Sequence, residues 1–139
     1  MNIQVVLNYI EAINAGDIDR LYGLMAENHI FIDAHDNRII GKENMKQSWI
    51  GYFALFPDYK IEVQEILEKN TLICILGYAG GTYKNLKDID NSNYWRVPAA
   101  WAAVVENKRI KQWQVYADNI FAIEIYNRNE KDSWSFDKD

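Results

Sequence analysis

The stretch NYIEAINAGDIDRLYGLMAENHIFIDAHDNRIIGKENMKQSW, residues 8–49, decides the fold. Apolar residues before Gly16 recur at helical spacing, and Gly16 is a natural residue to end that helix. Asp17 then caps a second helix, whose apolar face runs from Ile18 to Met25. The sequence therefore predicts a domain that opens with two short helices joined at a Gly-Asp junction.

A strand and a third helix follow within the same stretch. From His29 the apolar period changes to two, which predicts a short strand, and Asp36-Asn37 makes a turn. The third helix begins after Gly41 and must stop before Pro57. One face of this helix is apolar: Met45, Trp49, Tyr52, Phe53 and Phe56. An aromatic stripe at helical spacing is more often core than the wall of a ligand site.

Beyond Pro57 the helical period disappears, and the sequence predicts long strands. They cover about residues 59–66, with a bulge near Gln64-Glu65, then 71–83, 94–105 and 110–118. The polar segment 84–93 is a surface loop. Helices first and strands later predict an α+β fold, a cone-shaped curved antiparallel sheet packed on three N-terminal helices. We expect one domain over 1–125 and a polar tail over 126–139, in which Trp134 and Phe136 hint at docking.

Composition excludes several classes of function. The chain has 139 residues, 49% of them hydrophobic, with a formal charge of −5. This excess of acid without clustered Lys or Arg argues against nucleic-acid binding. No apolar run approaches the roughly 20 residues needed to cross a bilayer, and no signal peptide is evident, so we expect a cytoplasmic protein and no membrane partner. The single cysteine, Cys74, is read as a small buried hydrophobe, and no zinc, nucleotide or dinucleotide motif predicts a metal or cofactor.

The order of these elements resembles the nuclear-transport-factor-2-like superfamily, most closely its SnoaL-like polyketide cyclase branch. Residues 8–49 are similar to the opening of that family, and WRVPAAWAAVVENKRIKQWQVYAD, residues 95–118, is similar to its paired last strands. The resemblance implies a cystatin-like α+β barrel with a hydrophobic pocket. It does not specify the reaction, because this fold hosts isomerases, cyclases, dehydratases, epoxide hydrolases and proteins without catalysis.

The resemblance also implies candidate catalytic residues. Tyr9 and Asp33 match the Tyr and Asp of the ketosteroid isomerases of this superfamily, while Ala100 stands where those enzymes place a protonated Asp. For a SnoaL-like cyclase, which needs no metal or cofactor, Asp118 is the best acid/base candidate, with Asp33, His35, Tyr9 and Tyr116 as partners. A carboxylate that faces an aromatic cavity loses hydration, so its pKa rises toward neutrality.

Each of these polar residues also has a purely structural interpretation. Asp33 can cap the turn that follows its strand. His35 can be an exposed loop residue, since AHDN is a turn signal. Asp118 can bond to local backbone amides, and Tyr9 can be core. The residues alone leave these alternatives open.

The remaining aromatic residues are assigned to a substrate pocket and to a dimer surface. The pocket is expected to hold a hydrophobic small molecule among Trp49, Phe53, Tyr78, Trp101, Trp113 and Tyr116. Trp95 and Trp101 share one face of their strand, and Tyr94 and Arg96 share the other. Trp113 and Tyr116 could belong to either surface. An outward sheet face rich in Trp or Tyr would otherwise be an exposed apolar patch, so we predict a homodimer that forms through this face of the sheet. Three functions remain open: a cofactor-independent cyclase or isomerase, a non-catalytic binding module, and a protein-interaction domain.

Overall fold

The computed structural model describes residues 2–86 and 90–137, with side chains described to residue 130. Over these residues, helices pack on one six-stranded sheet. The helices are α1 (Asn2–Ala15), α2 (Ile18–Leu24), α3 (Lys42–Leu55), the 3-10 helix η1 (Tyr83–Asn85) and α4 (Ile120–Asp137). The strands are β1 (Met25–Ile32), β2 (Arg38–Ile40), β3 (Lys60–Lys69), β4 (Leu72–Thr82), β5 (Tyr94–Glu106) and β6 (Arg109–Ala117). Among the described helices, none combines the length and apolar character that a membrane crossing needs.

The first two helices confirm the predicted junction. Gly16 has a φ of +63°, a conformation that suits glycine at the end of α1. Asp17 accepts a hydrogen bond from the backbone N–H of Arg20 at 3.1 Å and so caps α2. The next boundary was predicted too late, because Met25 already has extended backbone angles and begins β1. The chain therefore passes from helix to strand without a loop.

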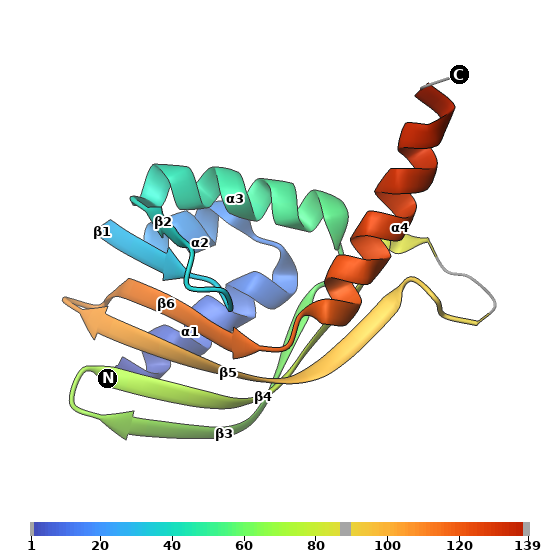
Figure 1. The fold of residues 1–139 in the computed structure, drawn as a ribbon. Coiled ribbons are helices and arrows are strands. Elements are labelled where there is room, and N and C mark those ends of the chain that lie inside the picture. Colours follow the sequence, from blue (N-terminus) through green and yellow to red (C-terminus); the bar gives the residue numbers. More distant parts are fainter. Residues whose placement is uncertain (1, 87–89, 138–139) are drawn as a thin grey trace.

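The strands lie side by side in the order β2-β1-β6-β5-β4-β3 (Figure 1). β1 runs parallel to β6, and the other neighbouring strands pair antiparallel. The sequence predicted an antiparallel sheet without this parallel pair, because periodicity says nothing about which strand lies beside which. The sequence also missed β2, which has three residues and is too short for a period to show.

The sheet is strongly curved and does not close. The register between β3 and β4 shifts between Val63 and Glu65, which confirms the predicted bulge. Gly77 lies on β4 beside this bulge, and a Cβ atom there would come within 1.8 Å of the Glu62 carbonyl oxygen. The two backbones thus approach too closely for any side chain. This bulge and this glycine let the sheet bend around the helices.

The helices cover the inner face of the curved sheet, and Figure 1 shows α3 above the strands. Side chains on β5 alternate as predicted: Trp95 and Trp101 are buried toward the helices, whereas Tyr94 and Arg96 point outward and are exposed. The hydrophobic core lies between this inner face and the helices.

The C-terminal segment forms a helix where a polar tail was expected. α4 passes through residue 125, the expected end of the domain, and Figure 1 shows it rising away from one end of the sheet. Ala122 and Ile125 are buried at its base. Arg128 donates to the Asn93 side chain at 2.7 Å. The expected docking of Trp134 and Phe136 concerns side chains outside those described, and residues 87–89 of the predicted 84–93 loop lie outside the described residues.

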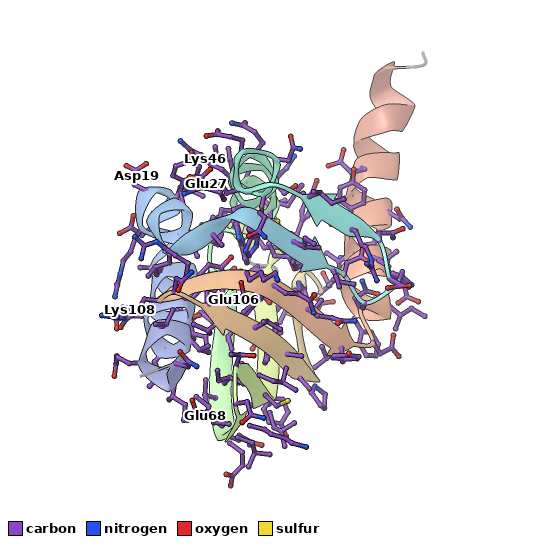
Figure 2. All side chains as sticks on the ribbon, turned by 90° about the vertical axis from the view of Figure 1, so that its left-hand side faces the viewer. Asp19, Glu27, Lys46, Glu68, Glu106 and Lys108 are labelled. Atoms are coloured by element: carbon purple, nitrogen blue, oxygen red, sulfur yellow. The ribbon has the colours of Figure 1, made fainter. Side chains whose placement is uncertain are left out.

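The opposite end of the molecule is charged and solvated. Figure 2 looks at this end, where the labelled side chains of Asp19, Glu68 and Lys108 lie at the periphery. Glu27 has a side chain that is 92% exposed even though Lys42 lies 3.7 Å away.

Candidate functional site

A cavity of about 390 Å³ lies between α3 and the inner face of the sheet. Its walls come from β1, β2, α3, β4, β5, β6 and the segments that follow β1, α3 and β6. Most of the lining residues are apolar or aromatic, and the exceptions are Asp33, Ser48 and Asn119. The complete lining is Phe31, Asp33, Ala34, Ile39, Met45, Ser48, Trp49, Tyr52, Leu55, Tyr59, Ala79, Trp95, Val97, Trp101, Trp113, Val115, Ala117 and Asn119. A concave, mainly apolar site with a few polar groups is the usual form of a small-molecule pocket.

Aromatic rings form a continuous part of the wall. Tyr52 and Tyr59 meet edge to face, with ring centroids 5.0 Å apart, and the Trp49 ring lies 6.2 Å from that of Tyr52. Trp95 continues the wall at 6.1 Å from Tyr59. Rings from the helical layer and from the sheet thus border the same space.

Two tyrosine hydroxyl groups on this wall, those of Tyr52 and Tyr59, have no hydrogen-bonding partner among the described residues. Burial raises the pKa of Tyr52 well above its ordinary value, with a smaller contribution from Tyr59, and burial alone raises the pKa of Tyr59. Both hydroxyls therefore stay protonated near neutral pH. They can donate hydrogen bonds to a ligand, or accept them from one.

Tyr9 lies behind the wall. Its hydroxyl accepts a hydrogen bond from the Trp49 Nε1–H at 3.3 Å, and its ring lies 4.9 Å from that of Trp113. The side chain is fully buried and is absent from the cavity lining, and burial raises its pKa strongly. Tyr9 thus holds two wall residues in place and does not line the cavity, which agrees with its interpretation as a core residue.

Asp33 lines the cavity just after β1 and caps the following turn. One carboxylate oxygen accepts from the backbone N–H groups of His35 and Asn37 at 2.8 and 2.9 Å, and the other accepts from the Asn37 side chain at 3.1 Å. Partial desolvation raises the pKa of Asp33, but these hydrogen bonds together outweigh it and hold the pKa below its ordinary value. Asp33 therefore both lines the cavity and caps the turn, and its carboxylate is ionised at neutral pH.

His35 is exposed and does not line the cavity, as its turn interpretation predicted. Its Nε2 lies 3.1 Å from Oδ1 of Asn119, a residue that does line the cavity. His35 can therefore orient Asn119 but does not itself border the ligand space.

Asp118 is exposed, and its carboxylate accepts the backbone N–H of Ile120 at 3.1 Å, the local role that its structural interpretation predicted. It does not line the cavity, so the pocket position expected for Asp118 belongs to Asn119. The reason is alternation: Trp113, Val115 and Ala117 face inward along β6, and Asn119 continues their row.

Three other predicted pocket residues lie elsewhere. Tyr78 and Tyr116 border a shallow depression on the outer face of the sheet, and Tyr116 is 56% exposed. Phe53 stacks on Trp49 at 5.2 Å but lies off the cavity. Ala100, compared above with an isomerase carboxylic acid, also faces outward, where it pairs with Tyr116. The next residue on β5, Trp101, faces inward but has no carboxyl group. The structure therefore brings Asp33, Trp49, Trp101 and Trp113 together and leaves the other predicted residues outside.

Of the eighteen wall residues, fourteen were not among the predicted site residues, and these include Ser48, Tyr52, Tyr59 and Trp95. Tyr52 stands one helical turn after Trp49, and Trp95 shares the strand face of Trp101, so periodicity did contain a signal for both. Within the described part of the chain, no group of three His, Cys, Asp or Glu side chains is placed to hold a metal ion.

Solved structures share this fold at low sequence identity. A candidate SnoaL-like polyketide cyclase from Shewanella denitrificans OS-217 is 15% identical, with a TM-score of 0.76 over 91% of this chain and 97% of that one. An LEH-like epoxide hydrolase of M. tuberculosis is 13% identical, with a TM-score of 0.75 over 91% and 90%. A protein with a ketosteroid isomerase-like fold from Catenulispora acidiphila DSM 44928, solved with trimethylamine, is 18% identical, with a TM-score of 0.71 over 81% and 84%. These similarities show the fold alone.

Comparison with curated proteins finds no match. The model of the SnoaL-like domain family, in contrast, matches residues 6–113, which include α2, α3, the first five strands and most of α1. The matched range ends at Trp113, inside β6, and contains nearly all of the cavity wall. The chain belongs to the SnoaL-like domain family.

Proposed function

We propose that this protein binds a small, mostly apolar organic molecule in the cavity between α3 and the sheet. The observation that carries the proposal is a cavity of about 390 Å³ whose wall is aromatic and whose tyrosine hydroxyls lack partners among the described residues. A hydroxyl group that has no protein partner and lines a cavity is available to bond to a ligand, so these hydroxyls favour a ligand that bonds to them. The relative from Catenulispora acidiphila holds a small organic amine, which supports a binding role in this fold.

The cavity favours binding over proton transfer. A carboxylate that removes a proton beside a carbonyl works best with a raised pKa, but the pKa of Asp33 is lowered. Asp118 and Tyr9 do not line the cavity. The groups expected to assist a base are therefore absent from the lining, and Asp33 is a weak base.

Tryptophan signals provide the test, because four of the five tryptophans line the cavity. Titration with the uncharged probe tert-butylbenzene is expected to change tryptophan emission and to shift indole N–H resonances in ¹H–¹⁵N spectra. Ser48→Phe puts a ring into the cavity and should weaken binding at least about tenfold, since space for the probe is lost.

Gln47→Phe is the matched control, because Gln47 is exposed on the same helix and does not line the cavity. This variant should bind the probe as the wild type does. If the probe leaves all the indole resonances unchanged, or if both variants bind equally well, the proposed function is wrong.

A second candidate function is proton transfer beside a carbonyl with Asp33 as the base, because Asp33 is the carboxylate that lines the cavity. The test follows deuterium exchange at the α-carbons of 2-tetralone in D₂O by NMR. Exchange faster than in buffer, lost in Asp33→Asn and kept in Asp118→Asn, is the result that this candidate requires. Exchange at the buffer rate would remove it and leave binding alone.

We also propose that the protein is a homodimer through the outer face of the sheet. Leu76 on β4, Ala100 on β5 and Tyr116 on β6 form a cross-strand row, and Leu76 and Tyr116 are 44% and 56% exposed. A contiguous apolar row on a sheet is typical of an interaction surface. A second copy of the chain would cover it.

A further inference from the structure

We propose that the ligand of the cavity is an organic cation, an alkylammonium whose head lies among the tryptophan and tyrosine rings with Asp33 as its counter-ion. This inference rests on the proposed binding function and names the class of ligand. It is drawn from the rings, the charge and the hydrogen bonds of the lining residues.

The first step is the arrangement of the rings. Trp49 and Tyr52 border the cavity from α3, whereas Trp101 and Trp113 border it from β5 and β6. The faces of aromatic rings carry partial negative charge, and tryptophan attracts cations best. Rings on both sides of one space can surround an alkylammonium head, and their apolar character suits its methyl groups.

The second step is the charge of the lining. Asp33 is the charged side chain among the described residues that line the cavity, and none of those residues is basic. The basic residue whose charge acts on Asp33, His35, does not line the cavity. Two other basic residues have acidic partners: Arg38 lies 3.8 Å from Asp36, and Lys42 lies 3.7 Å from Glu27. An anionic ligand would therefore meet a like charge without compensation, whereas a cation would find a counter-ion.

The third step is the hydrogen bonding of Asp33. One carboxylate oxygen accepts two backbone N–H groups, but the other accepts only the Asn37 side chain. A carboxylate has about four acceptor positions, so one remains for a ligand. The same hydrogen bonds keep the pKa of Asp33 below its ordinary value and thus keep the charge in place. The residues of this turn therefore hold the Asp33 carboxylate at the cavity in its ionised form.

The test compares two probes of nearly the same shape, phenyltrimethylammonium and tert-butylbenzene, by calorimetry and by the indole N–H resonances. Both are expected to bind, since both fill the apolar space. Asp33→Asn should weaken the cation at least fivefold and change the affinity for tert-butylbenzene less than twofold, because only the cation interacts with the charge.

Asp36→Asn is the matched control, because Asp36 is a carboxylate of the same turn whose side chain is 77% exposed and does not line the cavity. It should change neither affinity more than twofold. Circular dichroism and thermal melting check that each variant folds. If Asp33→Asn does not fold, Asn119→Asp gives an independent result. A second carboxylate on the lining should strengthen binding of the cation at least threefold relative to the affinity for the uncharged probe.

The two proposals fail in different ways. If tert-butylbenzene binds but phenyltrimethylammonium does not, or if Asp33→Asn weakens both probes equally, the cation inference is overturned and the binding function stands. If Asn119→Asp leaves the cation affinity unchanged, the inference is overturned as well. If neither probe binds, both proposals are wrong.

Discussion

At the scale of single residues, one step along the segment that follows β6 decides which side chain lines the cavity. Asp118 and Asn119 are neighbours, yet Asn119 lines the cavity and Asp118 accepts a backbone N–H outside it. Successive side chains of an extended segment point to opposite faces, so a shift of one residue exchanges an acid for an amide. The candidate chemistry of the site changes with it, from an acid/base pair to one ionised Asp33.

His29 gives a prediction for stability against pH. It is fully buried, its Nδ1 lies 2.8 Å from the Ile110 carbonyl oxygen, and its Nε2 has no partner among the described residues. Burial is the main cause that lowers its pKa below 6.5; the bond to Ile110 opposes this effect, and Lys42 adds to it. The folded protein therefore keeps His29 neutral where the unfolded chain binds a proton.

The free energy of unfolding should accordingly fall as the pH drops from about 7 toward 5, by at most about 1.4 kcal/mol per pH unit for this one group. Urea unfolding at several pH values measures it. His29→Gln removes the titrating group and should flatten the profile in this window. Equal slopes for the wild type and His29→Gln would contradict the prediction.

At the scale of elements, the bulge in β3 and the glycine beside it shape the sheet. The register shift after Val63 turns the second half of β3, and Gly77 lets the backbones of β3 and β4 approach there. Without this bend the sheet would be flatter and would enclose less space under α3. The cavity therefore depends on residues that do not line it.

Gly77→Ala tests this dependence. The added Cβ would come within 1.8 Å of the Glu62 carbonyl oxygen, so the backbone must move, and we expect a loss of about 1–3 kcal/mol in the free energy of unfolding. Gly51→Ala is the control, because nothing lies within 4 Å of that position on α3 and alanine favours a helix. A Gly77→Ala variant as stable as the wild type would show that the close approach does not constrain the sheet.

At the scale of the whole molecule, the two faces of the sheet present different surfaces. The inner face borders the cavity, and the outer face carries the exposed row of Leu76, Ala100 and Tyr116. α4 lies at one end, anchored by Ala122 and Ile125, and rises away from the sheet in Figure 1, while Leu76 and Tyr116 of the row stay 44% and 56% exposed. A second copy of the chain is therefore free to pack there.

Leu76→Lys should convert the dimer into a monomer, since it places a charge in the proposed interface. Size-exclusion chromatography with light scattering should give the wild type twice the 16.3 kDa mass of the chain and the variant a single mass. Ile50→Lys is the control, because Ile50 is equally exposed, at 44%, but lies on α3. A wild type that elutes at 16.3 kDa over all concentrations would exclude the dimer.

Sequence patterns predicted the elements well where an element is long enough to show a hydrophobic period. The Gly16-Asp17 junction, the limits of α3, the bulge near Gln64 and the alternation on β5 all follow from local rules of capping, turns and burial. Prediction was weaker where an element is short or polar, as for β2, or where composition resembled a tail, as for α4. In those segments contacts with distant residues stabilise the structure, and local patterns do not record such contacts.

The sequence by itself determined the α+β fold, the family and the aromatic residues from which a pocket could be built. Only the tertiary structure decided which aromatic residues surround the cavity, that Asp33 lies at it while Asp118 does not, and that Tyr9 is core. The physical reason is that periodicity shows which residues share a face, but not which layer packs on that face. A cavity exists only where two layers, far apart in sequence, fail to fill the space between them.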